Sequence, residues 1–228
     1  MRKNEEEFQY TKEVIRVPMT VVFLMWFVYW MEIKFQINFT RHGVFPRTIS
    51  GLQGILFSPF IHGDIKHLFN NTIPIFVFLG MLFYFYRALA WRVLLLGLVL
   101  SGFGTWLIGV KAFHIGMSGL VYMLFSFIFF SGMFRKYYRL LAVSLIVIFL
   151  YGSMVWYVFP IDRAISWEGH LSGLISGLAI SLVYRKMGPQ QKKHQFTKNE
   201  FDTWFDEEGN FNPPQPEVED ESDENLLA

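Results

Sequence analysis

Two residues of this sequence have the chemical types that nucleophilic catalysis needs, and both lie among glycines. Ser118 is framed by Gly116 and Gly119 in the stretch HIGMSGLVY, and His170 opens the sixth predicted helix in the stretch GHLSGLISG. A serine hydroxyl is a weak nucleophile until an adjacent base takes its proton, and histidine is the base used most often. The two residues therefore predict a Ser–His dyad, with Ser118 as nucleophile and His170 as general base.

The sequence offers no acid that could orient the histidine as the third member of a triad. Glu168 is only two residues from His170, so on a helix its side chain would point in another direction. Tyr122 lies one helical turn after Ser118, where an aromatic ring could hold the imidazole by stacking. We therefore expect a dyad supported by Tyr122.

A serine nucleophile also needs hydrogen-bond donors for the oxyanion that forms in the tetrahedral intermediate. In the stretch HGDIKHLFNN, His67 and Asn71 are four residues apart, and on a helix they would share a face. Their side-chain N–H groups and the backbone N–H of Ser118 are the predicted donors. Gly116 and Gly119 would keep the backbone around the serine accessible.

The elements that must position these residues are predicted to be membrane helices. The chain has 228 residues, 53% of them hydrophobic and 19% aromatic, which is too apolar for an ordinary soluble domain. The formal net charge of +1 conceals an acidic tail, because the eleven acids from Glu200 onward lie in a segment without lysine or arginine. Cysteine is absent, which excludes thiolate metal sites, and we expect no metal, no cofactor and no nucleic-acid partner.

A helix that spans a bilayer needs about 20 largely apolar residues. Six segments qualify, which predicts an all-α membrane protein with a six-helix bundle. The expected spans are residues 17–36, 66–86, 91–110, 116–134, 139–159 and 169–185. They define a membrane domain at 17–185, between an N-terminal arm at 1–16 and a mostly disordered acidic tail at 186–228.

Lysine and arginine predict the orientation of this bundle. Fourteen of the 20 basic residues lie in the two terminal segments, in the loops after the second and fourth spans, or at the span ends that border them. We therefore expect both termini in the cytoplasm. The long first loop at 37–65 would lie outside, and its apolar character is typical of an amphipathic helix in the membrane interface.

The predicted dyad and oxyanion residues are expected to lie at nearly the same depth in the membrane. Distances along each helix can be counted from the basic residue that ends it, at 1.5 Å per residue: Asn71 lies about 24 Å above Arg87, Ser118 about 25 Å above Arg135 and His170 about 22 Å above Arg185. Gly169, Gly173 and Gly177 add a small-residue stripe beside His170, on which the helix that carries Ser118 could pack closely.

Each feature taken alone has a plainer explanation. A lone serine in a membrane helix usually bonds its own backbone, and flanking glycines usually serve packing. A transporter or metal-binding protein that uses His62, His67, His114 and His170 is an alternative from another class. Against it, His62 and His67 are five residues apart, about 140° around a helix. A catalytically inactive relative that only binds membrane segments is the third hypothesis.

Together the motifs resemble the rhomboid family of intramembrane serine proteases. GMSG matches the family's GxSG nucleophile motif, GHLSGLISG resembles its GHxxGxxxG motif, and HGDIKHLFNN resembles its HxxxxHxxxN stretch. The resemblance implies a six-helix bundle in the bacterial cytoplasmic membrane that cleaves transmembrane protein substrates near their outer ends, without metal or cofactor. It also implies that His62 is a structural or cavity-lining residue.

Three parts of the chain are not explained by this resemblance. Many members of the family carry Trp-Arg in the first loop where this chain has Gln53 and Gly54, and His114 has no assigned role. In the tail, the stretch FTKNEFDTWF predicts a short helix with Thr197 as N-cap and Glu200 as its capping-box partner. This helix is interpreted as a surface helix or as a docking motif for a protein partner.

Overall fold

The protein is described by a computed structural model over residues 10–135, 138, 141–142, 145–146, 149, 156–161, 165–188 and 199–214. It divides into two units, at residues 1–191 and 192–228. Most of the predicted fifth span at 139–159 lies outside the described residues. The number of spans therefore stays a prediction, as do the domain boundaries that follow from it.

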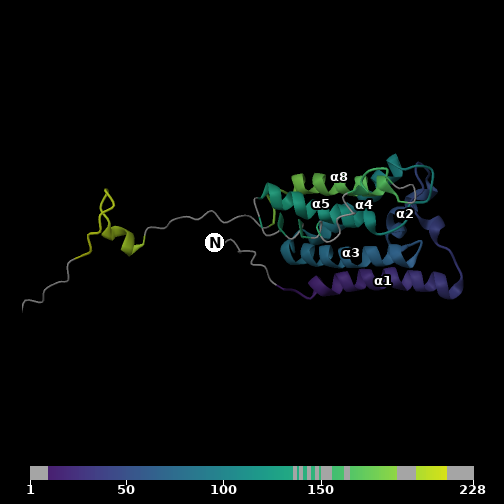
Figure 1. The fold of residues 1–228 in the computed structure, drawn as a ribbon, viewed down its shortest axis with the longest axis horizontal. Coiled ribbons are helices and arrows are strands. Elements are labelled where there is room, and N and C mark those ends of the chain that lie inside the picture. The colour runs from purple at the N-terminus through teal and green to yellow at the C-terminus, as the bar shows by residue number, and fades with distance from the viewer. Residues whose placement is uncertain are drawn as a thin grey trace, which may run out of the picture. The chain divides into compact units, whose positions relative to one another are not determined.

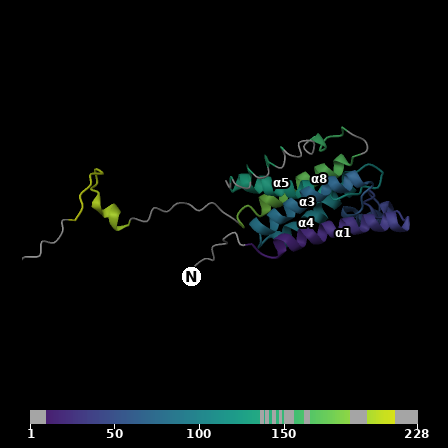
Figure 2. The same ribbon diagram turned by 60° about the horizontal axis from the view of Figure 1, so that its bottom comes forward.

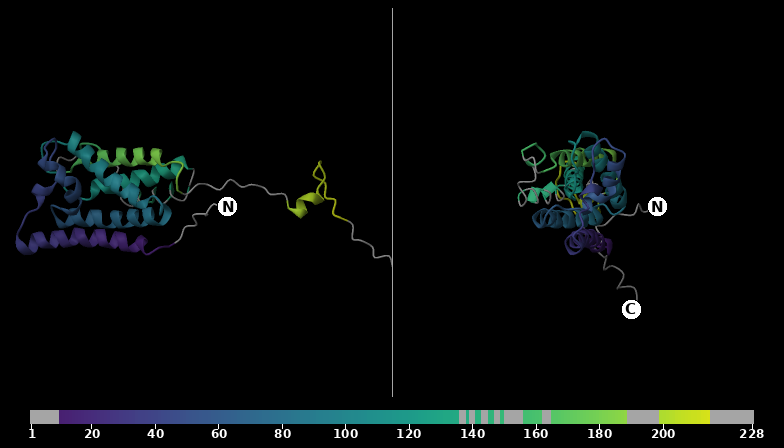
Figure 3. Two further views of the ribbon diagram at one scale, coloured as in Figure 1. Left: turned by 180° about the vertical axis from the view of Figure 1, so that it is seen from behind. Right: turned by 90° about the vertical axis from the view of Figure 1, so that its right-hand side faces the viewer.

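The first unit is a helical bundle (Figure 1). Its long helices are α1 (Glu13–Phe35), α3 (Ile65–Phe85), α4 (Ala90–Ile108), α5 (Ser118–Phe134) and α8 (Trp167–Val183). Each begins and ends within a few residues of a predicted span. α1 lies beside α3, and α5 packs against α3, α4 and α8 (Figures 1 and 2). Figure 3 shows the same helices from behind and along the bundle.

Three of the described helices have the length and composition of membrane spans. α1, α3 and α4 are each long and apolar enough to cross a bilayer, and α5 is apolar but shorter, at 17 residues. The described residues contain no strand, only two isolated β-bridges. The predicted all-α membrane fold is confirmed.

Burial shows that α5 is the central helix and α1 a peripheral one. α5 buries residues around its whole circumference, including Tyr122, Ser126 and Phe127. α1 fully buries only Val14, Pro18 and Met25. One face of the helix packs against the core, and its other face exposes large apolar side chains, among them Phe23, Trp30 and Ile33, as expected for a helix in contact with lipid. The residue at the start of α5 is therefore held by neighbours on several sides.

The glycine stripe of α8 faces α5, as its spacing predicted. A methyl group at Gly173 would lie 2.1 Å from the carbonyl oxygen of Gly119, and one at Gly177 would lie 2.2 Å from that of Met123. These separations are far below van der Waals contact, so the two backbones can approach this closely only where α8 carries glycine. Ser126 adds a hydrogen bond of 2.6 Å from its hydroxyl to the carbonyl of Leu174 on α8.

A buried arginine joins the C-terminal ends of the same two helices. Arg135 follows α5, and its guanidinium donates to the carbonyls of Tyr184 and Met187, which follow α8. The same group lies 5.4 Å from the ring centroid of Tyr86, in a cation–π contact. Helix C-termini leave backbone carbonyls without partners. Arg135 donates hydrogen bonds to two such carbonyls after α8 and thereby holds the end of α5 beside the end of α8.

The segment between α1 and α3 is not the single amphipathic helix that its composition suggested. It forms four short helical turns, η1 (Thr40–His42), η2 (Ser50–Gln53), α2 (Gly54–Phe57) and η3 (Ser58–Phe60). The chain crosses itself here, since a methyl group at Gly54 would lie 2.1 Å from the backbone nitrogen of Val44 and one at Gly51 would lie 2.0 Å from the carbonyl oxygen of Phe45. A continuous helix cannot make these contacts.

The second unit contains a short 3-10 helix, η4 (Glu200–Trp204). Its capping box is formed by Asn199 and Asp202, so the predicted box of Thr197 and Glu200 was wrong in register by two residues. Asparagine caps at least as well as threonine, which explains the shift. The rings of Phe201, Trp204 and Phe205 gather around Phe211, with centroids within 6.2 Å of it.

The close contact between α5 and α8 predicts unequal effects of two glycine-to-alanine substitutions. Gly177→Ala forces a methyl group against the Met123 carbonyl and should cost about 1–3 kcal/mol of stability. Gly80→Ala is the matched control in α3, because its methyl group would have its nearest neighbour at 3.6 Å and would gain helix propensity. Thermal unfolding in detergent should give a clearly lower midpoint for Gly177→Ala. A midpoint at or above that of Gly80→Ala would contradict the packing.

Candidate active site

The structure brings Ser118 and His170 into direct contact. Ser118 is the first residue of α5, and His170 lies in the first turn of α8. The Nε2 atom of His170 lies 2.8 Å from the Oγ atom of Ser118, which is hydrogen-bonding distance. His170 is buried, with 5% of its surface exposed, so this contact is shielded from solvent.

A backbone carbonyl orients the histidine. The other ring nitrogen, Nδ1, lies 2.8 Å from the carbonyl oxygen of Tyr157. A carbonyl only accepts hydrogen bonds, so Nδ1 carries the proton and Nε2 has the lone pair that accepts from the serine hydroxyl. Tyr157 thus takes the orienting position that a carboxylate has in a triad. Residue types could not reveal it, because any residue has a carbonyl.

The ring of Tyr122 supports the imidazole from one face. Its centroid lies 4.2 Å from that of His170, and the two planes are inclined by 14°. Stacking of this kind restricts rotation of the imidazole about its own side-chain bonds. Tyr122 and Tyr157 together leave His170 one orientation, with Nε2 directed at Ser118.

Two backbone N–H groups at the start of α5 have no acceptor within the described part of the chain and could bind an oxyanion. The preceding N–H groups are already used, since Gly116 donates to the carbonyl of Ser58 at 2.8 Å and Met117 donates to the ring of His62 at 3.4 Å. The N–H groups of Ser118 and Gly119 belong to the first turn, where a helix has no internal acceptors. The positive end of the helix dipole also favours an anion there.

Gly116 is required for the approach of His67. Its φ of +106° is in the left-handed region, which glycine adopts without strain. A methyl group at Gly116 would also lie 2.6 Å from the Nε2 atom of His67. The imidazole of His67 therefore lies against the backbone two residues before Ser118. Position 116 requires glycine both for its backbone conformation and for the room that it leaves to His67.

His67 and Asn71 lie on consecutive turns of α3, as their spacing predicted. The amide nitrogen of Asn71 donates one hydrogen to the carbonyl of His67 at 3.0 Å, and an amide has a second hydrogen to donate. Asp64 caps this helix by accepting from the backbone nitrogen of His67 at 2.8 Å. The contact of His67 with Gly116 places the N-terminus of α3 next to that of α5.

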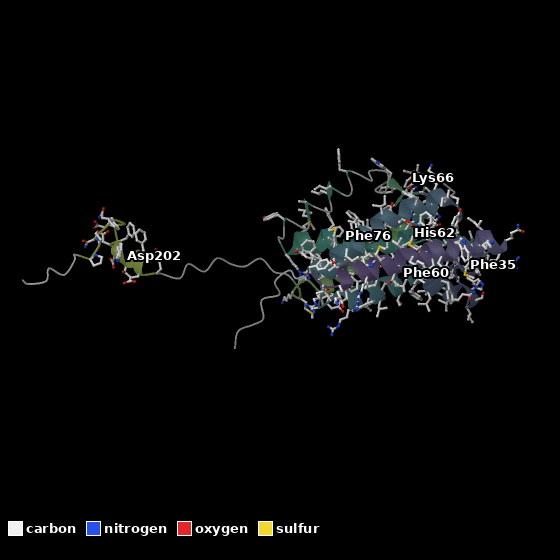
Figure 4. The ribbon with its side chains drawn as sticks, turned by 90° about the horizontal axis from the view of Figure 1, so that it is seen from below. Phe35, Phe60, His62, Lys66, Phe76 and Asp202 are labelled. Atoms are coloured by element: carbon white, nitrogen blue, oxygen red, sulfur yellow. The ribbon has the colours of Figure 1, made fainter. Side chains whose placement is uncertain are left out.

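His62 lies before α3 and not on it, so the angle argument based on a helix was wrong for this residue. Its ring centroid is 5.0 Å from that of His67, in an edge-to-face contact. Figure 4 shows His62 towards the end of the bundle at which α1 ends with Phe35. Among the described residues, no three His, Asp or Glu side chains are grouped as metal ligands would be.

A cavity of about 40 Å³ with both polar and apolar lining adjoins Ser118. Its lining includes Ser118 and Gly119 of α5 and further polar side chains from four other segments: Ser58, Ser101, Thr105, His114 and Ser166. A cavity of this size with several polar groups can hold an ordered water molecule. Hydrolysis inside a bilayer would need a water molecule at such a place.

The first loop is anchored without the usual Trp-Arg pair. Arg47 donates from its backbone to the carbonyl of Trp106 at 3.1 Å and from its side chain to that of Leu107 at 3.0 Å. In return the indole of Trp106 donates to the carbonyl of Thr48 at 2.8 Å. These contacts bind the loop to the end of α4. The glycine at position 54 lies instead where two backbones cross.

The family of the chain follows from comparison with known proteins. A family model for the rhomboid domain matches residues 50–187. The chain is 31% identical over 193 residues to uncharacterized proteins of Mycobacterium bovis and Mycobacterium tuberculosis, covering 76% of this chain and 76% of each relative. An uncharacterized protein of Mycobacterium leprae is 32% identical over 196 residues, covering 76% of this chain and 72% of that protein.

Together with the apolar helical bundle, these matches define an integral membrane protein. The chain belongs to the rhomboid family, which comprises intramembrane proteases and their relatives. The predicted resemblance to this family is confirmed.

The contact with Tyr157 predicts the tautomer of His170. We expect a protonated Nδ1 and an Nε2 that carries a lone pair and accepts a hydrogen bond at neutral pH. Nitrogen-15 NMR of histidine-labelled protein measures this directly, with His170→Gln used to assign the signal. A proton on Nε2 in the resting protein would contradict the geometry.

The burial of His62 predicts a pH dependence of stability. Burial, with a smaller contribution from neighbouring His67, lowers the pKa of His62 to about 3, whereas an unfolded histidine titrates near 6.5. The unfolded chain therefore binds a proton between about pH 6.5 and 3 that the folded chain does not, so stability falls as pH falls through this window.

The variant His62→Gln removes this titration but keeps an acceptor near the position of Nε2 for the N–H of Met117. Thermal unfolding between pH 7 and pH 4 should show a steeper loss of stability in the native protein than in this variant. His42→Gln is the control, since His42 is exposed. Parallel curves for native protein and His62→Gln would show that His62 is not held neutral.

Proposed function

We propose that this protein is an intramembrane serine endopeptidase that cleaves transmembrane protein substrates through a dyad of Ser118 and His170. The observation that carries the proposal is the 2.8 Å hydrogen bond from the Ser118 hydroxyl to the Nε2 atom of His170. The orientation of that imidazole by Tyr157 supports it, because a general base must present its lone pair to the proton it removes.

In the first half of the reaction Ser118 forms an ester with the substrate. Its Oγ attacks the carbonyl carbon of the scissile peptide bond while the hydroxyl proton passes to Nε2 of His170. The tetrahedral intermediate then collapses, the C–N bond breaks, and the leaving amine takes the proton from His170. The carbonyl half of the substrate remains bound to Ser118 as an acyl-enzyme.

The oxyanion of both intermediates would lie at the N-terminus of α5. The backbone N–H groups of Ser118 and Gly119, the imidazole N–H of His67 and the second amide hydrogen of Asn71 are the proposed donors. Removing one donor of this kind typically lowers kcat by about 10²–10³-fold. Gly116 contributes by allowing His67 to approach.

In the second half of the reaction water releases the product. The cavity beside Ser118, with its several polar lining groups, supports the presence of this water. His170 takes a proton from the water, and the resulting hydroxide attacks the ester carbonyl. The second tetrahedral intermediate breaks its bond to Oγ, the proton returns from His170 to Ser118, and the new carboxyl product leaves. The enzyme is regenerated without a metal or cofactor in any step.

The substrate and the location follow from the bilayer. We propose that the cleaved segment is a transmembrane helix that unwinds beside the N-termini of α5 and α8, because a helical backbone hides its carbonyls from attack. The distribution of basic residues supports a cytoplasmic position for both chain termini and an active site towards the outer face of a bacterial cytoplasmic membrane. The acidic tail, with its aromatic cluster, is a proposed site for a protein partner.

Substitution of the nucleophile tests the proposal in liposomes that contain the protein and a transmembrane reporter. Ser118→Ala should lower the cleavage rate by at least about 10³-fold, as loss of a catalytic serine does elsewhere. Ser126→Ala is the matched control on α5, because it removes a hydroxyl bonded to α8 at Leu174 without touching the dyad, and should cleave within about threefold of the native rate.

Two outcomes would overturn the proposal. Cleavage by Ser118→Ala at the native rate would remove the serine from the mechanism. Failure of the native protein both to cleave any transmembrane reporter and to react with a fluorophosphonate would identify it as an inactive relative.

A further inference from the structure

We propose that His114 and Ser166 form a latch that holds the base-bearing helix in register with the nucleophile, which makes His114 a positioning residue. The inference rests on the proposed function, since it concerns the rate at which the dyad reacts. His114 is 7% exposed, and neither the predicted mechanism nor the motifs gave it a role.

The latch pairs the same two residue types as the dyad, four residues earlier on each segment. The Nδ1 atom of His114 lies 2.5 Å from the Oγ atom of Ser166. His114 precedes Ser118 by four residues, and Ser166 precedes His170 by four residues. Both pairs are therefore 52 residues apart, with histidine and serine exchanged between the two segments. A shift between the two segments that disturbs one pair disturbs the other.

The hydrogen bonds of the latch have a single consistent direction. The Nε2 atom of His114 faces the carbonyl of Val110 at 3.1 Å, so Nε2 carries the proton and Nδ1 accepts. The hydroxyl of Ser166 therefore donates to Nδ1 of His114. Its oxygen in turn accepts the backbone N–H of Gly169 at 3.3 Å.

The chain of hydrogen bonds ends on the base itself. The backbone carbonyl of Ser166 accepts the N–H of His170 at 3.3 Å, so Ser166 holds the first turn of α8 through two successive N–H groups. An N-cap serine needs only the contact with Gly169. The additional bond to His114 fixes the rotamer of that serine and ties the start of α8 to the segment that leads into Ser118.

The segment that carries His114 is itself rigidly held. The backbone of His114 exchanges both hydrogen bonds with that of Val44, each at 2.9 Å. Glu168 on α8 accepts the N–H of Val110 at 3.3 Å through a buried carboxylate. The latch therefore joins three segments, the first loop, the turn before α5 and the start of α8, at the mouth of the site.

Two polar substitutions separate the two hydrogen bonds of the imidazole. His114→Asn places an amide oxygen near the position of Nδ1, where it can accept from Ser166, but loses the donor to Val110. His114→Gln reaches Val110 with an amide N–H but offers no acceptor at Nδ1. His114→Ala loses both contacts. Each polar variant thus lacks one hydrogen bond, and a purely structural role would affect both alike.

The test measures kcat, KM and the unfolding midpoint for these variants with a transmembrane reporter in liposomes. His114→Ala and His114→Gln should lower kcat by about 10–100-fold, since small misplacements of a base have effects of this size. KM should stay within about twofold. His114→Asn should keep kcat within about threefold of native, although its unfolding midpoint falls as much as that of His114→Gln.

The rate of Ser118 labelling by a small fluorophosphonate should follow kcat, because this reagent needs the dyad but no transmembrane binding. Equal kcat values for His114→Asn and His114→Gln, or a raised KM at native kcat, would overturn the latch. If the native protein neither cleaves nor labels, the proposed function fails instead. The latch is then judged by the nitrogen-15 shift of Nε2 in His170, which should change in His114→Gln and persist in His114→Asn.

Discussion

The structure of the membrane unit depends on how closely α5 approaches α8. A hydrogen bond of 2.8 Å between Ser118 and His170 requires both a short distance between two helix axes and a fixed register along them. Glycines at 173 and 177 set the distance, since any side chain there would meet backbone atoms of α5. Arg135 fixes the C-terminal ends of the pair. The site lies at the opposite ends, where both helices begin.

Around this contact, backbone groups take the positions that side chains have in a catalytic triad. The carbonyl of Tyr157 orients His170, and the carbonyl of Ser58 holds the loop before Ser118. In a bilayer an unpaired polar group is costly. Each of these hydrogen bonds therefore has two effects: it positions a group of the site, and it gives a backbone carbonyl a partner. The irregular first loop is consequently part of the site, because it supplies both Ser58 and His62.

The chemistry-bearing residues and the helices could be predicted, whereas the connections could not. Apolar length identified α1, α3, α4 and α5, and spacing identified the face of α3 that carries His67 and Asn71. The path of residues 36–64 escaped prediction, because it depends on backbone crossings at Gly51 and Gly54 that have no periodic pattern. The role of Tyr157 as an orienting carbonyl and the partnership of His114 with Ser166 escaped for the same reason: both join segments distant in sequence.

The central claim is that His170 activates Ser118, and the most direct measurement is the position of a covalent adduct. After treatment of the native protein in membranes with a fluorophosphonate, peptide mass spectrometry should find the phosphonyl group on Ser118 alone among the serines. The adduct should be absent from His170→Ala treated in the same way. Modification of another serine, or equal modification of Ser118 in His170→Ala, would contradict the account.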